Sequence, residues 1–308
     1  MADIILHHYA NSPFSEKIRL IFGYKQIAWK SVVIPAIMPK PNLTALTGGY
    51  RRTPVLQIGS DIYCDTALIA DVLERVTPTP TLYPKQSEGA ARILAQWADA
   101  TLFWTVIAYV FQPAGMQGVL GGMTPEQMKA FAADRAAFRS TQPRMSVQEA
   151  SGYLPLYLQR LENMLEGGQP YLFGADASIA DFAVYHCLWF LQLAPALTGI
   201  LEPTPRLREW SDRMKRFGHH HSEEMRAETA LEIARSHASG PLDIPFVNTH
   251  GASLGDRVSI MPTDYGLDPV EGELVLSTAN EFVVRRTDPL AGTVTVHFPR
   301  LGFQLKKI

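Results

Sequence analysis

The sequence predicts three units in succession: an α/β unit over residues 1–83, an all-α unit over 84–240 and a small all-β unit over 241–308. In the first unit, short apolar runs typical of strands alternate with segments of helical periodicity. In the second, helix start signals recur, and in the third apolar and polar residues alternate as in half-buried strands. The third unit is too small to bury much surface alone, so it is expected to pack on the rest.

The first unit is expected to fold in the order strand, helix, strand, loop, strand, strand, helix. Its segments are strand 4–9, helix 13–25, strand 29–34, loop 35–52, strands 55–58 and 62–64, and helix 66–76. The loop assignment follows from the prolines and glycines of residues 35–52. Gly59 in the short turn between the last two strands indicates a hairpin.

The all-α unit follows Pro78 and Pro80, which resist both helix and strand. Thr124, Ser146 and Ser178 each begin a pattern typical of a capping box, in which a hydroxyl and an acidic or amide side chain three residues later cap a helix. Beyond residue 241 we expect about five short strands.

Composition excludes several classes of protein. Hydrophobic residues make up 46% of the chain and charged residues 19%, which excludes intrinsic disorder. The formal net charge of −2 provides no global field for nucleic acid or an anionic membrane. The most apolar segments, 102–111 and 182–191, are shorter than the ~20 residues of a membrane span, and the N-terminus lacks a signal-peptide pattern. We therefore expect no nucleic-acid or membrane partner.

The cysteines and histidines indicate neither disulfides nor a metal. Cys64 and Cys187 are the two cysteines of the chain, too few for a disulfide framework or a Cys-rich zinc site. A reducing compartment, the cytoplasm, is the natural expectation. The run His219-His220-His221 does not form a metal site on a helix, because consecutive side chains point about 100° apart.

Ser12 lies where the first strand gives way to the first helix, and Pro13 suits the first helical position. A helix N-terminus stabilises anions and lowers the pKa of a thiol brought to it. A serine hydroxyl at this point donates a hydrogen bond to a thiolate, favouring the charged form. Ser12 serves equally well as a simple helix cap, so this segment alone leaves both roles open.

The chain resembles a known family through several motifs in a characteristic order. Ser12-Pro13-Phe14-Ser15 is similar to the Cys-Pro-aromatic-Cys motif of glutaredoxins with both sulfurs replaced by oxygen. Thr53-Pro54 precedes a strand where the thioredoxin-like fold has a cis proline, and Asp65-Thr66 opens a helix. Leu82-Tyr83-Pro84, Ser178-Ile179-Ala180-Asp181 and Pro205-Arg206-Leu207-Arg208-Glu209-Trp210 complete the series. Over residues 1–217 the sequence resembles the cytosolic glutathione S-transferase family, serine type.

The resemblance implies a thioredoxin-like N-terminal domain followed by a helical domain, and it implies roles for individual residues. Ser12 matches the serine that activates the glutathione thiol, although Tyr9 competes with it as hydroxyl donor. The positions that match glutathione-binding residues are Lys40, Arg52, Thr53, Val55, Asp65 and Thr66. Lys40 and Arg52 would meet the glycyl carboxylate, or would be solvated surface cations instead. Residues 241–308 lie outside the resemblance, and their role stays open.

The second substrate is expected in a cleft between the two domains, lined by Tyr9, Phe14, Phe103, Trp104 and Phe111. An aromatic stripe of this kind is also typical of ordinary core. If part of it faces the cleft, it favours a small apolar electrophile. Met116 and Met123 then provide an adaptable rim.

Two hypotheses remain from the sequence. The first is a cytoplasmic glutathione transferase of detoxification that transfers alkyl or aryl groups, uses glutathione as co-substrate without a metal, and forms a homodimer as family members usually do. The second is a non-catalytic glutathione- or ligand-binding scaffold with the same fold, which the unfamiliar β-rich tail motivates. The electrophile is not identified by the sequence.

Overall fold

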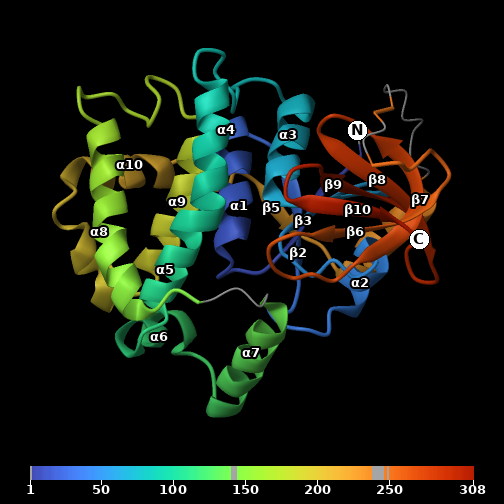
Figure 1. Ribbon diagram of the computed structural model, residues 1–308, viewed down its shortest axis with the longest axis horizontal. Coiled ribbons are helices and arrows are strands. Elements are labelled where there is room, and N and C mark those ends of the chain that lie inside the picture. Colours follow the sequence, from blue (N-terminus) through green and yellow to red (C-terminus); the bar gives the residue numbers. More distant parts are fainter. Residues whose placement is uncertain (1, 140–143, 238–245, 248–249) are drawn as a thin grey trace.

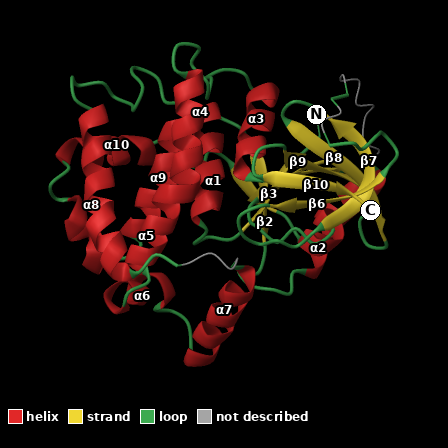
Figure 2. Ribbon diagram, in the orientation of Figure 1, coloured by secondary structure: helices red, strands yellow, loops and turns green. Residues whose placement is uncertain are grey.

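A computed structural model describes residues 2–139, 144–237, 246–247 and 250–308. The helical part of the molecule lies beside a single twisted sheet, as Figure 1 and Figure 2 show. Ten strands form this sheet in the order β10-β6-β7-β8-β9-β4-β3-β1-β2-β5. The sheet therefore combines strands from the beginning and the end of the chain.

The N-terminal domain has the expected order of strands and helices, with one addition. Its elements are β1 (Ile4–His8), α1 (Pro13–Lys25), β2 (Trp29–Val33), α2 (Pro41–Thr47), β3 (Val55–Ile58), β4 (Asp61–Cys64) and α3 (Thr66–Val76). Strand β1 pairs parallel to β2 and antiparallel to β3, and β3 and β4 form the expected hairpin. The Thr53–Pro54 peptide bond is cis, as the resemblance implies.

Helix α2 corrects the expectation of a loop over residues 35–52. Pro41 stands at the start of the helix, where a proline costs nothing because its missing N–H has no helical partner. Gly48 ends the helix in the left-handed region at φ 78°. Leu43 and Leu46 are buried against the C-terminal part of the chain, and this distant contact stabilises a helix too short to persist alone.

The helical domain consists of α4 (Glu88–Trp97), a π-helical turn (Ala98–Leu102), α5 (Phe103–Val110), α6 (Pro113–Leu120), α7 (Pro125–Phe138), α8 (Val147–Met164), α9 (Ile179–Gln192), a 3₁₀ turn (Pro195–Leu201) and α10 (Pro205–Lys215). The capping boxes at Thr124, Ser146 and Ser178 are confirmed. The segment Glu88–Val110 is long and apolar enough to satisfy a composition test for a membrane span, which core helices of soluble proteins also satisfy.

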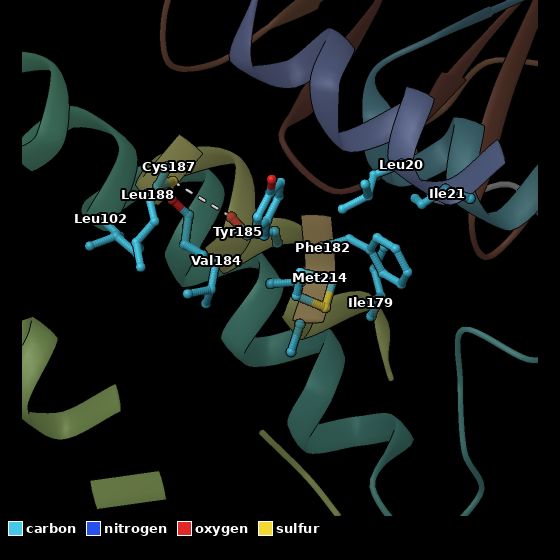
Figure 3. Close-up of a cluster of buried hydrophobic side chains, with 14 of the residues drawn as sticks. Leu20, Ile21, Leu102, Ile179, Phe182, Val184, Tyr185, Cys187, Leu188 and Met214 are labelled. Carbon is cyan, nitrogen blue, oxygen red and sulfur yellow. Dashed lines mark hydrogen bonds between the residues drawn. The ribbon is translucent and has the colours of Figure 1, made fainter. Parts of the chain in front are cut away.

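Helix α9 joins the helical domain to the first domain. Figure 3 shows Leu20 and Ile21 of α1 beside Phe182 of α9, within one buried apolar cluster. The carboxylate of Asp181 is fully buried and accepts hydrogen bonds from the backbone of Leu172 and Ser178 and from the indole of Trp210. A buried polar group must be bonded in this way, so the motif fixes the start of α9.

The chain returns to the sheet after α10. Strand β5 (Ser222–Glu224) pairs with β2, and α11 (Ala227–Ser236) packs against α2 and β9. These two elements lie before residue 241, where the sequence places the start of the last unit.

The β-rich C-terminal region is present with the expected five strands, β6 (Arg257–Pro262), β7 (Val270–Ser277), β8 (Glu281–Asp288), β9 (Gly292–Pro299) and β10 (Phe303–Lys307). Strand β9 pairs parallel to β4 of the first domain, with Ile62 opposite Val296. This pairing covers an edge of the N-terminal sheet that would otherwise leave backbone groups unpaired. The region packs on the rest of the molecule, as expected, and the sheet does not mark it off as a separate small domain.

Candidate functional site

Ser12 lies in the connection between β1 and α1 and is the N-cap of α1. Its Oγ accepts a hydrogen bond from the backbone N–H of Ser15 at 3.2 Å. Within the described residues no acceptor contacts the Ser12 hydroxyl, so its proton is available to a ligand. Ser12 therefore caps the helix by accepting a hydrogen bond at Oγ, and its O–H group can still donate one to a ligand.

A pocket of about 730 Å³ opens beside Ser12, between the N-terminal domain, α5, α6 and α7. Its lining includes all five residues named for the second substrate, Tyr9, Phe14, Phe103, Trp104 and Phe111, together with Met116 and Met123. The Phe14 ring lies 4.7 Å from the rings of both Phe103 and His186, which fixes it at the domain boundary. Ser12 thus faces a largely apolar cavity able to hold a small molecule.

Lys40 and Thr53 belong to the same pocket, and Lys40 is not a solvated surface cation. The Lys40 residue is 4% exposed, and its ammonium group donates to the hydroxyl of Thr53 at 3.2 Å and lies 5.8 Å from the centre of the Tyr9 ring. Burial lowers the pKa of Lys40 to about 8, and the nearby charge of Arg135 acts in the same direction. Lys40 is thus a buried cation in the same pocket as Ser12, and it loses its proton more easily than an exposed lysine does.

Arg52 also lines the pocket, but the C-terminal region engages it. Its guanidinium group donates to the carboxylate of Asp264 and to the backbone oxygen of Tyr265. The guanidinium carbon lies 3.8 Å from the centre of the Tyr265 ring, and Asp65 is 4.0 Å away. The carboxylate of Asp264 therefore already pairs with Arg52, the cation that was expected to bind a carboxylate of glutathione.

Tyr265 is a pocket residue that the sequence reasoning missed. It lies between β6 and β7, and its ring makes edge contacts with Trp104 at 5.1 Å and Phe138 at 5.2 Å. The N–H of Gly266 donates to the oxygen of Phe138 at 2.8 Å, and a Cβ at Gly266 would lie 2.7 Å from the Phe138 ring. The resemblance ends before this loop, so the available signal was an aromatic residue inside a polar turn.

Val55, Asp65 and Thr66 are not among the described residues that line this pocket. Val55 is fully buried in β3, directly after the cis proline. Asp65 is the N-cap of α3 and accepts from the N–H of Ala67 at 2.9 Å. Burial raises the pKa of Asp65, and the charge of Arg52 opposes that rise. The helix start expected for the γ-glutamyl end is formed, and Asp65 lies 4.0 Å from Arg52, which lines the pocket.

A buried charge cluster lies beneath Thr66, and the sequence reasoning did not find it. The ammonium group of Lys17 is 2.6 Å from Asp99 and 3.3 Å from the hydroxyl of Thr66. His186 contacts the other oxygen of Asp99 at 2.9 Å, as a satisfied core histidine. Burial raises the pKa of Asp99, but Lys17 and His186 outweigh burial and hold it below its usual value. Lys17 and Asp99 are 82 residues apart, so no local pattern shows the pair.

The described part of the chain contains no group of three or more His, Cys, Asp or Glu side chains arranged to hold a metal ion. His219 instead contacts Glu16, and Cys64 and Cys187 are buried free thiols.

Comparisons with known proteins agree with this architecture. The family description "Glutathione S-transferase, N-terminal domain" matches residues 6–81, and "Glutathione S-transferase, C-terminal domain" matches residues 133–217. No curated protein matches the chain. A GST-like protein from Pseudomonas syringae is 43% identical over 100% of both chains, with a TM-score of 0.85. That similarity includes the β-rich tail.

More distant structures share the fold of the first two domains. Rice GST1 in complex with glutathione is 19% identical, covers 72% of this chain and 92% of its own, and gives a TM-score of 0.51. Human glutathione-S-transferase T1-1 in its apo form is 16% identical, covers 69% of this chain and 83% of its own, and gives a TM-score of 0.53. On the two domain matches and the full-length similarity, the chain belongs to the glutathione S-transferase family.

Proposed function

We propose that the protein is a glutathione transferase that joins the sulfur of glutathione to an electrophilic carbon of a small apolar molecule. The observation that carries this proposal is the Ser12 hydroxyl, which caps α1 and faces an apolar pocket of about 730 Å³. Members of the family bind glutathione, and the rice relative contains it.

In the proposed reaction Ser12 donates a hydrogen bond to the thiolate and the N-terminus of α1 adds positive potential. The thiol proton passes to solvent, the sulfur forms a bond to the electrophilic carbon, and the leaving group departs with the electron pair of the bond that breaks. The chain's contribution is thiolate stabilisation and positioning of the two reactants.

The other glutathione contacts are proposals on the same basis. The backbone of Val55 would pair with the cysteinyl part, Asp65 and Thr66 would hold the γ-glutamyl end, and Lys40 with Thr53 would hold the glycyl carboxylate. Lys40 supports this assignment because its buried ammonium has no carboxylate within 4.0 Å in the described part of the chain. Arg52 joins the set only if Asp264 releases it.

Ser12→Ala tests the proposal. It should lower kcat for conjugation by about 10²-fold, the effect of removing one donor to a developing anion, while the Kd for glutathione stays within a factor of about two. Steady-state kinetics on a panel of electrophiles measure kcat, and calorimetry with glutathione measures the Kd.

Ser15→Ala is the matched control, because the buried Ser15 hydroxyl has no hydrogen-bond partner among the residues that the structure describes, and its backbone N–H makes the contact with Ser12. It should leave kcat unchanged. Equal turnover of Ser12→Ala and the native chain on every electrophile would reduce Ser12 to a helix cap.

A non-catalytic binding protein is the second candidate, and one observation favours it. Asp264 and Tyr265 both accept hydrogen bonds from Arg52, and Tyr265 lines the pocket, so the tail covers part of the site. Calorimetry with glutathione at millimolar concentration separates the two, since a transferase must bind it. Cytoplasmic location, a role in detoxification and homodimer formation belong to the first proposal, and light scattering of the purified chain tests the dimer.

A further inference from the structure

The loop between β6 and β7, residues 263–269, is the part of the tail that reaches the pocket. Strands β6 and β7 pair antiparallel, so both ends of the loop are held in the sheet. The N–H of Thr263 also donates to the oxygen of Gly302 at 3.0 Å. A short loop held by two paired strands presents its side chains in defined positions. The tail therefore supplies a fixed piece of the pocket wall, formed by Tyr265.

Tyr265 contacts three parts of the molecule that surround the pocket. Its ring centre lies 5.1 Å from that of Trp104 on α5 and 5.2 Å from that of Phe138 on α7, in an edge-to-face arrangement in both cases. From the N-terminal domain, the guanidinium carbon of Arg52 lies 3.8 Å from the centre of the same ring. Aromatic pairs and cation–π contacts at these distances are attractive. Tyr265 is therefore held where α5, α7 and the N-terminal domain come together.

The residue after Tyr265 allows the loop to approach α7 closely. Gly266 has a φ of 58°, and its N–H donates to the backbone oxygen of Phe138 at 2.8 Å. A Cβ at Gly266 would lie 2.7 Å from the Phe138 ring, so the ring or the loop would have to move. The positive φ and the close approach both favour glycine at this position. The loop and the C-terminal end of α7 thus fit each other without room for a side chain.

Helix α7 is anchored to the N-terminal domain and to the tail. None of its fourteen residues is buried, and Figure 1 shows α7 apart from the other helices, at the lower edge of the view. Asp134 joins the helix to the N-terminal domain through Arg51, 2.7 Å away, and Phe138 joins it to Tyr265 and Gly266 of the tail. The tail loop therefore helps to set the distance between the α7 side of the pocket and the α5 side.

Four aromatic residues that line the pocket form a continuous row ending at the tail. The ring centres of Phe14 and Phe103 are 4.7 Å apart, those of Phe103 and Trp104 are 5.1 Å apart, and those of Trp104 and Tyr265 are 5.1 Å apart. The row begins on α1, two residues after Ser12, and crosses α5. An apolar ligand that lies along this row from the Ser12 end therefore reaches Tyr265 last.

We propose that Tyr265 is a specificity-determining residue, whose ring closes the pocket on the side of the tail and limits the length of the apolar ligand that the pocket takes. A ligand that ends before this ring gains apolar contact along the row. A longer ligand has to displace a ring that three neighbours hold in place, which is unfavourable in a packed site. That the ligand is also the electrophile of a transfer reaction rests on the proposed function.

A series of alkyl phenyl ketones tests the length limit without any reaction. Acetophenone, butyrophenone, hexanophenone and octanophenone share one uncharged head group and differ in the length of the alkyl chain. Their affinities are measured by displacement of the uncharged fluorophore 6-propionyl-2-(dimethylamino)naphthalene from the native full-length chain. Each added methylene should tighten binding about fourfold, equivalent to about 0.8 kcal/mol, until the ligand reaches Tyr265. Beyond that length the affinity should stop rising.

Tyr265→Ala should move this limit to longer chains. We expect it to tighten octanophenone binding about tenfold or more and to change acetophenone binding less than about twofold, because only the longer ligand enters the space that the ring leaves. Tyr265→Phe keeps the ring and should keep the native limit. Leu267→Ala is the control, since Leu267 belongs to the same loop, is 43% exposed and is not among the residues that line the pocket. A purely structural Tyr265 would instead weaken all four ketones alike in the alanine variant.

Gly266→Ala perturbs the same junction without removing a ring. Its methyl group should separate the loop from Phe138 and also move the limit to longer chains, so it tests the inference even if Tyr265→Ala does not fold. Near-UV circular dichroism shows which variants are folded. Identical chain-length profiles in the native chain and the folded variants of Tyr265 and Gly266, or an equal shift in Leu267→Ala, would overturn the inference.

Calorimetry with glutathione separates this inference from the proposed function. A length limit that moves in Tyr265→Ala, in a protein that does not bind glutathione, would uphold the inference and overturn the transferase. Glutathione conjugation with the same chain-length profile in the native chain and in Tyr265→Ala would do the reverse. A native chain that binds neither the fluorophore nor any of the ketones would also overturn the inference.

Discussion

Lys40 has its ammonium group in a position only 4% exposed, among two arginines and one aspartate. The sequence placed this residue in a loop with an uncertain role, because nothing local shows that Arg135, almost a hundred residues later, lies near it. Ser12 was different: its position before Pro13 at the end of an apolar run is a local pattern, and the cap it predicts is present. Residues whose role follows from their neighbours in sequence could thus be predicted, and residues whose role follows from distant charges could not.

Lys40 leads to a pH prediction. Burial lowers its pKa to about 8, so in the ligand-free protein the charge is present below that pH and is lost as the pH rises through it. We expect the affinity for S-methylglutathione, which keeps both carboxylates but has no thiol, to fall roughly tenfold from about pH 7 to 9. Calorimetry across this range measures it.

Lys40→Arg provides the comparison, because a guanidinium group stays protonated throughout this range. Its affinity profile should be flat, apart from the titration of the ligand's own amine. The same slope in both proteins would mean that Lys40 does not meet a glutathione carboxylate.

At the scale of elements, the loop between β6 and β7 supplies Asp264, the carboxylate that pairs with Arg52 at the site. Arg52 should contribute to glutathione binding only when Asp264 no longer neutralises it. We expect Asp264→Asn to tighten the Kd for glutathione several-fold, roughly 3- to 10-fold, since, among the described residues, Arg52 then keeps only the carboxylate of Asp65 at 4.0 Å and can take a closer one from the ligand. The effect on stability should be small because Asp264 is half exposed. Calorimetry with glutathione measures the change.

Asp268→Asn is the control for this loop. It removes the same charge, and its carboxylate lies 4.0 Å from Arg51. It should leave the Kd for glutathione within about twofold. If Asp264→Asn weakens glutathione binding instead, the loop holds Arg52 in place for the ligand and does not compete with it.

The elements themselves divide by the range of the interactions that form them. The capping boxes at Thr124, Ser146 and Ser178 and the hairpin of β3 and β4 depend on residues within one or two turns, and the sequence predicted them. Helix α2 was missed because its prolines were interpreted as breakers, although Pro41 stands at the one position where proline begins a helix.

At the scale of the whole molecule, the pairing of β4 with β9 joins residues more than two hundred positions apart. The alternation of residues 292–299 shows a strand but not its partner, because many strands share that period. The sequence therefore predicted a β-rich tail that packs on the rest, and only the structure shows that the tail completes the N-terminal sheet. The position of Tyr265 in the pocket follows from the same long-range pairing.

This shared sheet predicts that damage to the tail destabilises the N-terminal domain. Phe298 of β9 is fully buried and packs on Tyr50, at 5.9 Å between ring centres, and on Phe303 of β10. Phe298→Ala should lower the free energy of unfolding by about 3–5 kcal/mol. Hydrogen exchange should then lose protection in the amides of β3 and β4 together with those of β8 and β9, because the two halves open as one unit. Leu301→Ala, at a position 75% exposed, should change neither. Loss of protection confined to β6–β10 would show that the tail unfolds separately from the N-terminal domain. Its hydrogen bonds to β4 would then not couple it to the glutathione-binding half.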